Sequence, residues 1–239
     1  MATKVALVGI GKIARDQHLP AINAAKDWQL AATVSRSASV AGIEAFTELE
    51  AMLAARPDIG VVSLCQPPLP RFDAAAAAIR SGRHVMLEKP PGASVAECQT
   101  LERMARAAGV TVFATWHSRE AAMVAPAKAW LVGKRLRRLA VVWKEDVRRW
   151  HPGQAWIWQP GGLGVFDPGI NALSIVSEIL PDPLRLAAAE LSFPANCDTP
   201  IAASLRFSHP HGAAVSAEFD FRQQGEQTWT IDIETSEGS

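Results

Sequence analysis

The sequence has 239 residues, of which 49% are hydrophobic and 20% are charged, and its 24 basic residues balance its 24 acidic residues. This composition is typical of a globular protein with one large or two modest domains, and the balanced charge gives no electrostatic preference for nucleic acid or an anionic membrane. No uncharged run reaches the ~18 residues that a membrane span needs, and the N-terminal stretch lacks the apolar core and cleavage site of a signal peptide.

In the first half of the chain, short apolar strands alternate with helical stretches. We expect strands at residues 4–10, 30–35, 60–65, 84–88 and 110–115. Helices are expected at residues 13–26 with a kink or restart at Pro20, at 47–55 with Thr47 as N-cap, at 71–80 and at 95–108. Apolar strands that alternate with helices predict a doubly wound parallel sheet covered on both faces.

After about residue 134 the pattern changes. We expect one strand at 137–146, a helix at 164–180, and then strands at 186–193, 201–208, 213–221 and 228–235. Consecutive strands separated by turns predict an antiparallel sheet. The sequence therefore predicts an α/β protein with two domains, residues 1–120 and residues 121–239, the second being an α+β domain with a largely antiparallel, open sheet.

The last predicted strand lies close to the end of the sequence. Trp229, Ile231 and Ile233 alternate with polar residues, so the strand has one face suited to burial. Without later strands the second sheet would expose this face and an unpaired edge. We therefore expect a truncated protein whose second domain lacks closing strands.

The segment GIGKIA, residues 9–14, lies where the first strand turns into the first helix. Gly9 permits a tight turn, Gly11 lets a pyrophosphate approach the backbone, and Ala14 is small enough for helix–strand packing. Small residues also make ordinary strand–helix turns, but the α/β units that follow favour a dinucleotide site. The residues assigned to the cofactor here are Gly9, Gly11, Lys12 and Ile13.

The end of the second strand indicates which nucleotide binds. An acidic residue at this position would bind the 2′-hydroxyl of NAD. The sequence has Ser35, Arg36 and Ser37 instead, and the arginine fork suits a 2′-phosphate. Arg36 could equally be a solvated surface residue. We expect NADP, with NAD as the alternative.

The stretch HVMLEKPP, residues 84–91, begins as a buried strand and then ends on two charges and two prolines. Ligands of a doubly wound sheet bind beyond the carboxyl ends of its strands. Lys89 lies at that edge, where we expect it to face the nicotinamide, although a lysine before a turn is often only solvated. The residues assigned to the cofactor at this edge are Cys65, Gln66, Pro67, Glu88 and Lys89.

Three segments together resemble the Gfo/Idh/MocA family (glucose–fructose oxidoreductase/inositol dehydrogenase), namely GIGKIA, EKPPGAS at 88–94 and GGLGVFDPGIN at 161–171. The resemblance covers essentially the whole chain. Within the family, WHSR at 116–119 and WKEDVRRWHPGQAWIW at 143–158 are similar to bacterial aldose 1-dehydrogenases that act on L-arabinose and D-galactose. The resemblance implies a Rossmann domain followed by an α/β domain with an open antiparallel sheet.

The resemblance also implies an activity and its residues. The aldose subgroup oxidises the anomeric carbon of a pyranose to a lactone and passes hydride to NAD(P). Lys89 matches the family lysine, which implies a cis bond to Pro90, and Asp167 matches the family aspartate. Many members have a histidine four residues after that aspartate, where this sequence has Asn171. Lys89 and Asp167 are therefore the acid–base candidates.

Oxidation at the anomeric carbon requires the anomeric hydroxyl to lose its proton as the hydride departs, and a positioned base contributes roughly 10²–10⁴-fold. Which of Lys89 and Asp167 takes this proton stays open. Asp167 precedes Pro168, so it is also a candidate N-cap with proline at the first helical position. A helix would place Asp167 and Asn171 on one face.

The tryptophan-rich segment 143–158 suits a sugar, because pyranoses present C–H faces to aromatic rings and hydroxyls to polar groups. Any one of its tryptophans could simply belong to the core, and His117 and His151 could be structural histidines. The residues assigned to the substrate are Lys89, His117, Glu145, His151, Asp167 and Asn171.

We expect no metal site, because the histidines are scattered and Cys65, Cys98 and Cys197 form no ligand pair. These cysteines predict reduced thiols in a cytoplasmic protein. The expected partner is a small sugar, without nucleic acid or membrane, and a homodimer through the C-terminal sheet is an alternative to a single subunit. Two other functions stay open: oxidation of a ring hydroxyl by a related sugar or polyol dehydrogenase, and a non-catalytic NADP-binding regulator.

Overall fold

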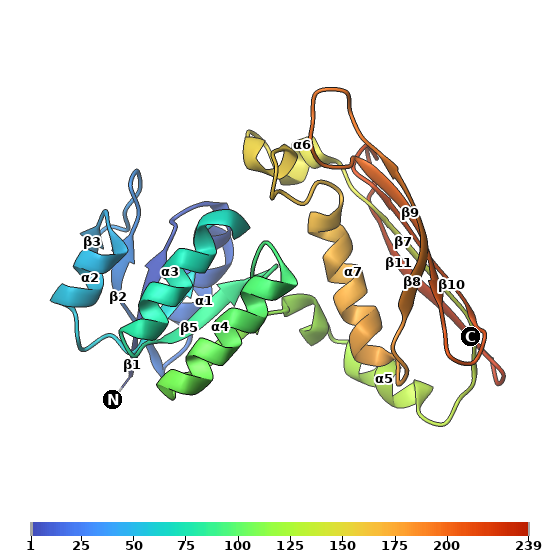
Figure 1. Ribbon diagram of the computed structural model, residues 1–239, viewed down its shortest axis with the longest axis horizontal. Helices are drawn as coiled ribbons and strands as arrows, with labels where there is room; N and C mark the ends of the chain where they lie inside the picture. The colour runs from blue at the N-terminus through green and yellow to red at the C-terminus, as the bar shows by residue number, and fades with distance from the viewer. Residues whose placement is uncertain (1, 239) are drawn as a thin grey trace. The chain divides into compact units, whose positions relative to one another are not determined.

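The computed structural model describes residues 2–238 and divides into two compact units, the first ending at Thr115 and the second beginning at Trp116 (Figure 1). The 3-10 helix His117–Glu120 belongs to the second unit, so the observed division lies slightly before the boundary expected at residue 120.

The first unit contains a parallel sheet of six strands in the order β3-β2-β1-β4-β5-β6. The strands are β1 (Thr3–Val8), β2 (Trp28–Val34), β3 (Glu44–Phe46), β4 (Val61–Leu64), β5 (His84–Glu88) and β6 (Val112–Thr115). Neighbouring residues of β1 face opposite sides: Ala6 and Val8 pack in the larger core, while Leu7 packs in a second core with Ala14. The predicted doubly wound sheet, covered on both faces, is confirmed.

The helices of the first unit are α1 (Leu19–Ala24), α2 (Leu49–Ala55), α3 (Pro68–Arg80) and α4 (Val95–Ala108). The restart predicted at Pro20 is confirmed, because a π-helical segment, Ala14–His18, precedes α1 and leaves Pro20 in the first turn of the new helix. Ser94 caps α4 by accepting the N–H of Glu97, and Gly109 ends it in the left-handed region.

One local expectation for the first unit is wrong, and one strand was not expected. The helix expected from Thr47 begins at Leu49, and its N-cap is Glu48, which makes no side-chain capping bond. The edge strand β3 was not expected, because three mostly exposed residues carry no apolar run. Its first residue pairs with Ala32, which extends the sheet beyond β2.

The second unit contains a sheet of five strands in the order β11-β7-β10-β9-β8. The strands are β7 (Leu136–Lys144), β8 (Arg185–Ser192), β9 (Ala202–Ser208), β10 (Ala214–Asp220) and β11 (Thr228–Thr235), and the helices are α5 (Val124–Leu131), α6 (Val147–Trp150) and α7 (Phe166–Ile179). Every neighbouring pair is antiparallel except β7 with β10. The largely antiparallel sheet is confirmed, whereas α5 was not expected.

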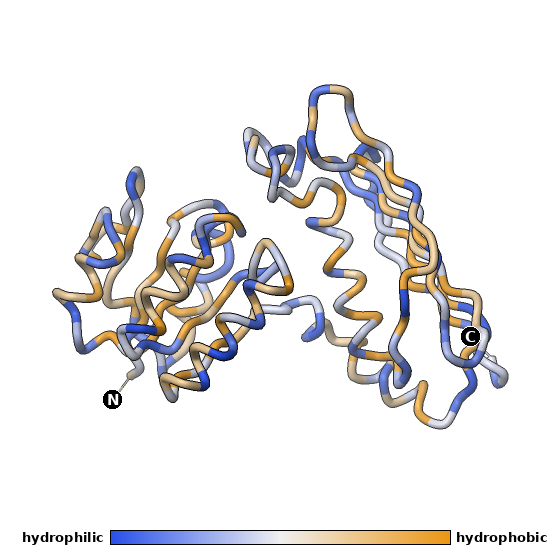
Figure 2. Tube along the Cα trace, viewed as in Figure 1, coloured by the Kyte–Doolittle hydropathy of each residue, from blue (hydrophilic) through white to orange (hydrophobic). Residues whose placement is uncertain are grey.

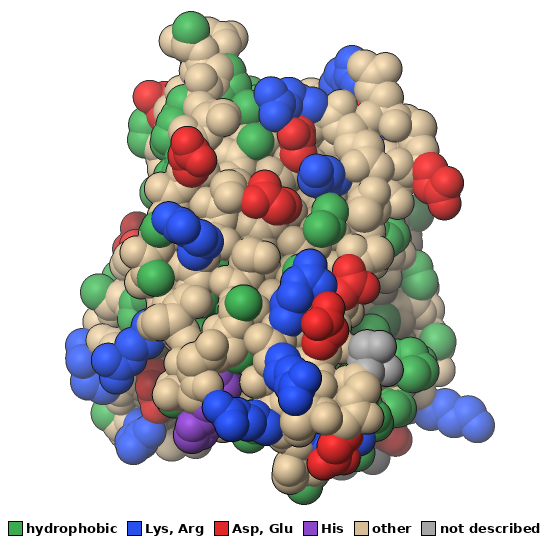
Figure 3. Space-filling view, turned by 90° about the vertical axis from the view of Figure 1, so that its right-hand side faces the viewer, with side chains coloured by type: hydrophobic (Ala, Val, Ile, Leu, Met, Phe, Trp, Pro, Cys, Tyr) green, Lys and Arg blue, Asp and Glu red, His purple; other side chains and the backbone are tan. Residues whose placement is uncertain are grey.

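Helix α7 packs on one face of this sheet (Figure 1). Val215, Ala217 and Phe219 alternate along β10 into the core beneath α7, and apolar residues recur along α7 and the strands (Figure 2). Acidic and basic side chains are interspersed over the side of the molecule in Figure 3. Arg138 pairs with Glu234 across β7 and β11 at 3.0 Å.

Strands β11 and β8 form the two edges of the second sheet within the described residues. The expectation that further strands close this sheet stays a prediction. None of the helices within residues 2–238 combines the length and the apolar character needed to cross a bilayer.

Candidate functional site

The turn after β1 leaves room for a ligand beside its backbone. Gly9 has φ 85°, in the left-handed region that favours glycine, and a Cβ there would lie 3.0 Å from the backbone nitrogen of Gln66. A Cβ on Gly11, in contrast, would meet no atom within 4 Å. Lys12 and Ile13 begin the helical segment that follows, so backbone N–H groups are available at this turn.

An open hollow lies beyond the carboxyl ends of β2 and β3. Its lining includes Arg15, Ser35, Ser37, Ser39 and Thr47. The Arg15 guanidinium donates to the Ser39 carbonyl oxygen at 3.3 Å, which holds this arginine against the loop after β2. Arg36 lies in the same loop and is exposed. The hollow therefore combines hydroxyl groups and a guanidinium, which are donors suited to a phosphate.

The carboxyl end of β4 leads into Cys65, Gln66 and Pro67. Cys65 is buried, and its N–H donates to the Val8 carbonyl oxygen at 2.8 Å. Gln66 Oε1 is buried and has no hydrogen-bond partner among the described residues. A buried acceptor without a donor is uncommon, and at this edge it offers a bond to a bound molecule. Together with the space beside Gly11, it shows that the edge fits a dinucleotide.

Lys89 directly follows β5, and its peptide bond to Pro90 is cis, which confirms the expectation from the family resemblance. The buried Arg71 on α3 donates to the carbonyl oxygens of Gln66, Glu88 and Pro90. One guanidinium thus ties the chain segments after β4 and β5 together on both sides of Lys89.

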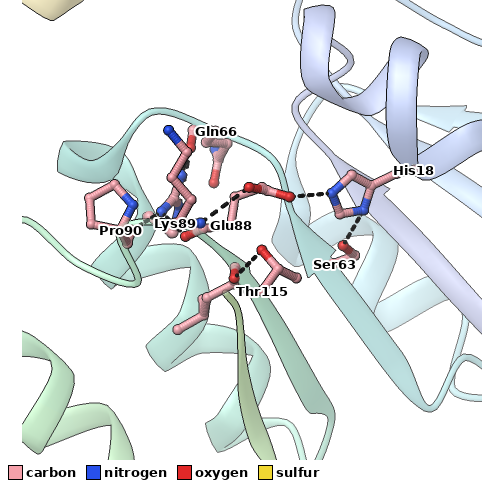
Figure 4. Close-up of polar contacts among 9 residues, drawn as sticks. His18, Ser63, Gln66, Glu88, Lys89, Pro90 and Thr115 are labelled. Atoms are coloured by element: carbon pink, nitrogen blue, oxygen red, sulfur yellow. Dashed lines mark hydrogen bonds and ion pairs between the residues drawn. The ribbon is translucent and has the colours of Figure 1, made fainter. Parts of the chain in front are cut away.

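A buried polar chain lies beneath Lys89 (Figure 4). Glu88 Oε1 lies 2.7 Å from His18 Nε2, and Glu88 Oε2 accepts the Lys89 N–H at 3.2 Å. On the other side of the imidazole, His18 Nδ1 lies 3.2 Å from Ser63 Oγ. The helical segment before α1 is therefore linked through β4 and β5 to the backbone of Lys89.

The protonation states of His18 and Glu88 follow from their contacts. Burial by itself lowers the pKa of His18, but hydrogen bonds with Cys65 and Glu88 outweigh burial and raise that pKa to about 10. Burial raises the pKa of Glu88, but the bond with His18 outweighs burial and holds that pKa below its usual value. The pair is therefore an imidazolium and a carboxylate at neutral pH.

In the second unit, Asp167 lies in the first turn of α7 and its Oδ2 is 3.2 Å from His151 Nε2. Helix α7 begins at Phe166 with Val165 as N-cap, so the alternative in which Asp167 is the N-cap is wrong. The other imidazole nitrogen, His151 Nδ1, lies 3.3 Å from Gln154 Oε1. Asp167 is therefore held by a side chain from outside its own helix.

Glu145 follows β7 and is buried beside this pair. Its Oε1 accepts the indole N–H of Trp143 at 3.0 Å. Burial raises the pKa of Glu145, and the negative charge of Asp167 adds to this effect, whereas hydrogen bonds from Trp143 and Trp229 and the charge of His151 oppose it. Glu145, His151 and Asp167 thus form one electrostatic cluster that we call the carboxylate–imidazole cluster.

Aromatic rings lie next to the carboxylate–imidazole cluster. Trp143 and Trp229 are directly paired across β7 and β11, and their rings stack with centroids 5.9 Å apart. Trp150 contacts the same Trp229 ring at 5.7 Å, and Trp229 is 48% exposed. Trp143, Trp156 and Trp158 pack against the core of the second unit, so the alternative of core tryptophans holds for these three.

Two further residues of the second unit were assigned to the substrate, Asn171 and His117. Asn171 is half-buried on α7, one helical turn after Asp167, as their spacing predicts. His117 is exposed at the start of the 3-10 helix His117–Glu120.

Sequence reasoning missed four residues of these regions: Arg15, His18, Arg71 and Trp229. Arg15 and His18 lie six and nine positions after Gly9, within an ordinary helical pattern. A buried arginine in an alanine-rich helix, such as Arg71, and a tryptophan opposite another in a sheet require tertiary contacts to be recognised. The only local signal was Trp229 itself, in a strand whose other apolar residues are aliphatic.

The chain is similar to known oxidoreductases. The family pattern described as "Oxidoreductase family, NAD-binding Rossmann fold" (Gfo/Idh/MocA) matches residues 3–115. A protein from Pseudomonas fluorescens named galactose 1-dehydrogenase is 44% identical, over 99% of this chain and 76% of that protein.

The chain is also similar to solved structures of dehydrogenases. The crystal structure of D-galactose-1-dehydrogenase from Rhizobium etli is 53% identical, with a TM-score of 0.94 over 99% of this chain and 77% of that one. The WlbA dehydrogenase from Bordetella pertussis, solved with NADH and UDP-GlcNAcA, shares the fold at 20% identity, with a TM-score of 0.87 over 98% of this chain and 77% of that one. The chain belongs to the Gfo/Idh/MocA family of oxidoreductases, with an NAD-binding Rossmann fold.

Proposed function

We propose that this protein is an NADP-dependent aldose 1-dehydrogenase that oxidises the anomeric carbon of a pyranose, D-galactose or L-arabinose, to the lactone. The observation that carries the proposal is 44% identity over 99% of the chain to a galactose 1-dehydrogenase. The buried acidic and imidazole groups beside exposed tryptophan in the second unit support a sugar, which offers hydroxyls for the former and C–H faces for the latter.

The first unit would hold the cofactor. The turn formed by Gly9, Gly11, Lys12 and Ile13 takes the pyrophosphate, and the segments 65–67 and 88–89 line the way to the nicotinamide. When bound, the nicotinamide accepts the hydride. Ser35, Arg36 and Ser37, with no carboxylate among them, favour NADP over NAD, and Arg15 adds a second guanidinium in the hollow beside them.

The second unit would bind the sugar. Glu145, His151, Asp167 and Asn171 supply hydrogen bonds to hydroxyls, and Lys89 and His117 complete the proposed contacts. A carboxyl whose pKa is raised, as burial raises that of Glu145, can donate a hydrogen bond when protonated and accept one when ionised. This dual capacity suits a hydroxyl, which both donates and accepts.

Lys89 and Asp167 are the proposed acid–base groups. The anomeric hydroxyl must release its proton as the hydride departs, and a positioned base contributes roughly 10²–10⁴-fold. Asp167 is fixed by His151 at 3.2 Å, and the backbone of Lys89 is fixed by Arg71 and Glu88. The Asp167 carboxylate and the backbone of Lys89 therefore start from ordered positions, which reduces the entropy lost in reaching a reactive geometry.

A panel of sugars with each cofactor tests the proposal. Reduced-nicotinamide absorbance should appear with D-galactose or L-arabinose, faster with NADP than with NAD, and the product should be a lactone that hydrolyses to an aldonic acid. A ketose product would instead support oxidation of a ring hydroxyl. Absence of turnover with every sugar, together with tight NADP binding, would support a regulatory protein.

Two further proposals concern the cellular location and the oligomeric state of the enzyme. The three cysteines are free thiols, which supports the cytoplasm as its location. A homodimer through the C-terminal sheet is supported by exposed Leu186 and Leu191 on β8 and by Phe193 just after it. Sedimentation of the wild type and of a Leu186→Glu variant tests the dimer, since a dimer that forms there should dissociate in the variant.

A further inference from the structure

Three hydrogen bonds hold the backbone around Lys89. Arg71 donates to the carbonyl oxygens of Glu88 and Pro90, the residues on either side of Lys89. The Lys89 N–H donates to Glu88 Oε2 at 3.2 Å. The third bond depends on the orientation of the Glu88 carboxylate, so the residue that fixes this carboxylate also acts on Lys89.

His18 is the charged partner of the Glu88 carboxylate, and the Thr115 hydroxyl is a neutral hydrogen-bond partner. His18 Nε2 lies 2.7 Å from Glu88 Oε1, and its Nδ1 is anchored by Ser63 Oγ at 3.2 Å (Figure 4). The His18 and Glu88 side chains are only 10% and 9% exposed. His18 itself lies at the end of the π-helical segment Ala14–His18, in the helical stretch that follows the Gly9–Gly11 turn. The His18 imidazole therefore links the helical stretch after the Gly9–Gly11 turn, through Glu88, with the backbone of Lys89.

The charges around His18 and Glu88 favour an ion pair. The ionisable group that faces His18 besides Glu88 is Cys65, after β4. Two cationic residues contact the Glu88–Lys89 backbone: the Arg71 guanidinium donates to the Glu88 carbonyl oxygen, and Lys89 donates its backbone N–H to the Glu88 carboxylate. Without the positive charge of His18, Glu88 would be a buried carboxylate, and the two cationic residues bonded to this segment are Arg71 and Lys89. A buried charge that loses its partner is costly, so the carboxylate would then compete for the Lys89 side chain.

We propose that His18 is a positioning residue for Lys89: its imidazolium orients the Glu88 carboxylate toward the Lys89 backbone N–H and neutralises its charge, so that Glu88 does not draw the Lys89 ammonium away from the reacting sugar. The proposal rests on the catalytic role proposed for Lys89. It concerns a residue in the nucleotide-binding unit that touches neither sugar nor reacting atoms.

Kinetics of His18→Gln, Glu88→Gln and the double variant test the proposal. His18→Gln should lower kcat about 10- to 100-fold, the range expected for loss of one hydrogen bond to a charged group, while KM for the sugar and Kd for NADP stay within about threefold. The double variant should recover most of this loss, because the two introduced amides would form a neutral pair without a stranded charge. The matched control is His84→Gln, at an exposed position of β5, the strand that also contains Glu88. This variant should leave kcat unchanged.

The pH profile separates positioning from a loss of fold. In His18→Gln the pKa of Glu88 rises, because its burial is no longer offset by the imidazolium. The kcat deficit of His18→Gln should therefore grow as pH rises and Glu88 ionises, whereas the ratio of the double variant to the wild type should stay constant. A purely structural role would lower kcat by the same factor at every pH, in parallel with the melting temperature.

Two measurements do not depend on turnover. In ¹⁵N-histidine NMR, His18 should remain doubly protonated at neutral pH. After ¹³C-dimethylation of lysines, the resonance that is absent from Lys89→Arg should move in His18→Gln and return in the double variant. If no sugar is oxidised, the proposed function fails while these signals still decide whether His18 acts on Lys89.

The result expected is a pH-dependent kcat loss that the double variant rescues, with the matching NMR changes. The proposal is overturned if His18 is neutral at pH 7, if the Lys89 resonance is unmoved in His18→Gln, or if that variant keeps kcat within about twofold of the wild type, less than the loss of one such hydrogen bond would cause. It is equally overturned if the double variant loses as much as the two single variants combined.

Discussion

Asp167 and His151 form a largely buried pair in which Oδ2 lies 3.2 Å from Nε2, with side-chain exposures of 8% and 15%. Gln154 Oε1 faces the other imidazole nitrogen and also accepts the indole N–H of Trp156 at 3.2 Å, which fixes its orientation. Both imidazole nitrogens thus face side-chain oxygens, so the ring is held between Asp167 and Gln154. The position of Asp167 in the first turn of α7 further stabilises its carboxylate.

This pair gives the first prediction. Asp167→Asn should lower kcat by at least about 10²-fold, because the amide cannot take a proton. Steady-state kinetics with the preferred sugar measures the effect, and circular dichroism establishes that the variant is folded. Asp198→Asn, at an exposed position of the same unit, is the control and should be fully active. A folded, fully active Asp167→Asn would leave the aspartate with a structural role only.

Lys89→Ala should reduce kcat by roughly 10²–10⁴-fold while NADP binding survives. The fold should persist, since the bonds from Arg71 and to Glu88 do not use the Lys89 side chain. Isothermal titration with NADP and sugar turnover separate the two effects. Lys26→Ala changes a lysine of the same unit that lies outside the proposed site and should change neither quantity. Near-normal turnover of Lys89→Ala would remove the central assignment.

Much of the first unit could be predicted because its signals are local. Each parallel strand except β3 is a short apolar run, and the helices between strands carry start or stop residues, such as Ser94 and Gly109 around α4. The glycines of the first turn and the charged end of β5 are likewise contiguous in the sequence. Strand β3 escaped prediction because it is short and mostly exposed, and because its pairing with β2 is a tertiary contact.

The parts of the site that could not be predicted depend on long-range contacts. His18 and Glu88 are 70 residues apart, and nothing in the helical pattern around His18 indicates that its imidazole is buried. Trp229 faces Trp143 only because β11 pairs with β7 in one particular register. The raised pKa of Glu145 likewise follows from burial and from neighbours on other elements rather than from the WKED segment.

The hollow beyond β2 and β3 gives a prediction for nucleotide choice. Arg36→Ala and Arg15→Ala should each weaken NADP binding about 10- to 100-fold, the loss expected for one hydrogen bond to a charged group, and leave NAD nearly unchanged. Fluorescence titration with both nucleotides measures the difference. Arg80→Ala, at the exposed end of α3, should affect neither nucleotide. An equal loss with NADP and NAD would contradict the assignment of the 2′-phosphate to this hollow.

Glu145 gives a prediction for stability against pH. Burial raises the pKa of its carboxyl above the ordinary value of 4.5, so between 4.5 and the raised pKa the folded state binds more protons than the unfolded state. Stability from this group is therefore fully present below about pH 4.5 and is lost as pH rises through the folded-state pKa.

Glu145→Gln keeps an oxygen acceptor for the Trp143 indole but cannot ionise, so its stability relative to the wild type should increase from about pH 4 to about pH 8. Melting temperatures of both proteins across this range test the sign, with Glu226→Gln, at an exposed position, as a control that should run parallel to the wild type. A constant difference between Glu145→Gln and the wild type would mean that the carboxyl ionises at its ordinary pH and that its burial is offset completely by the indole donors and His151.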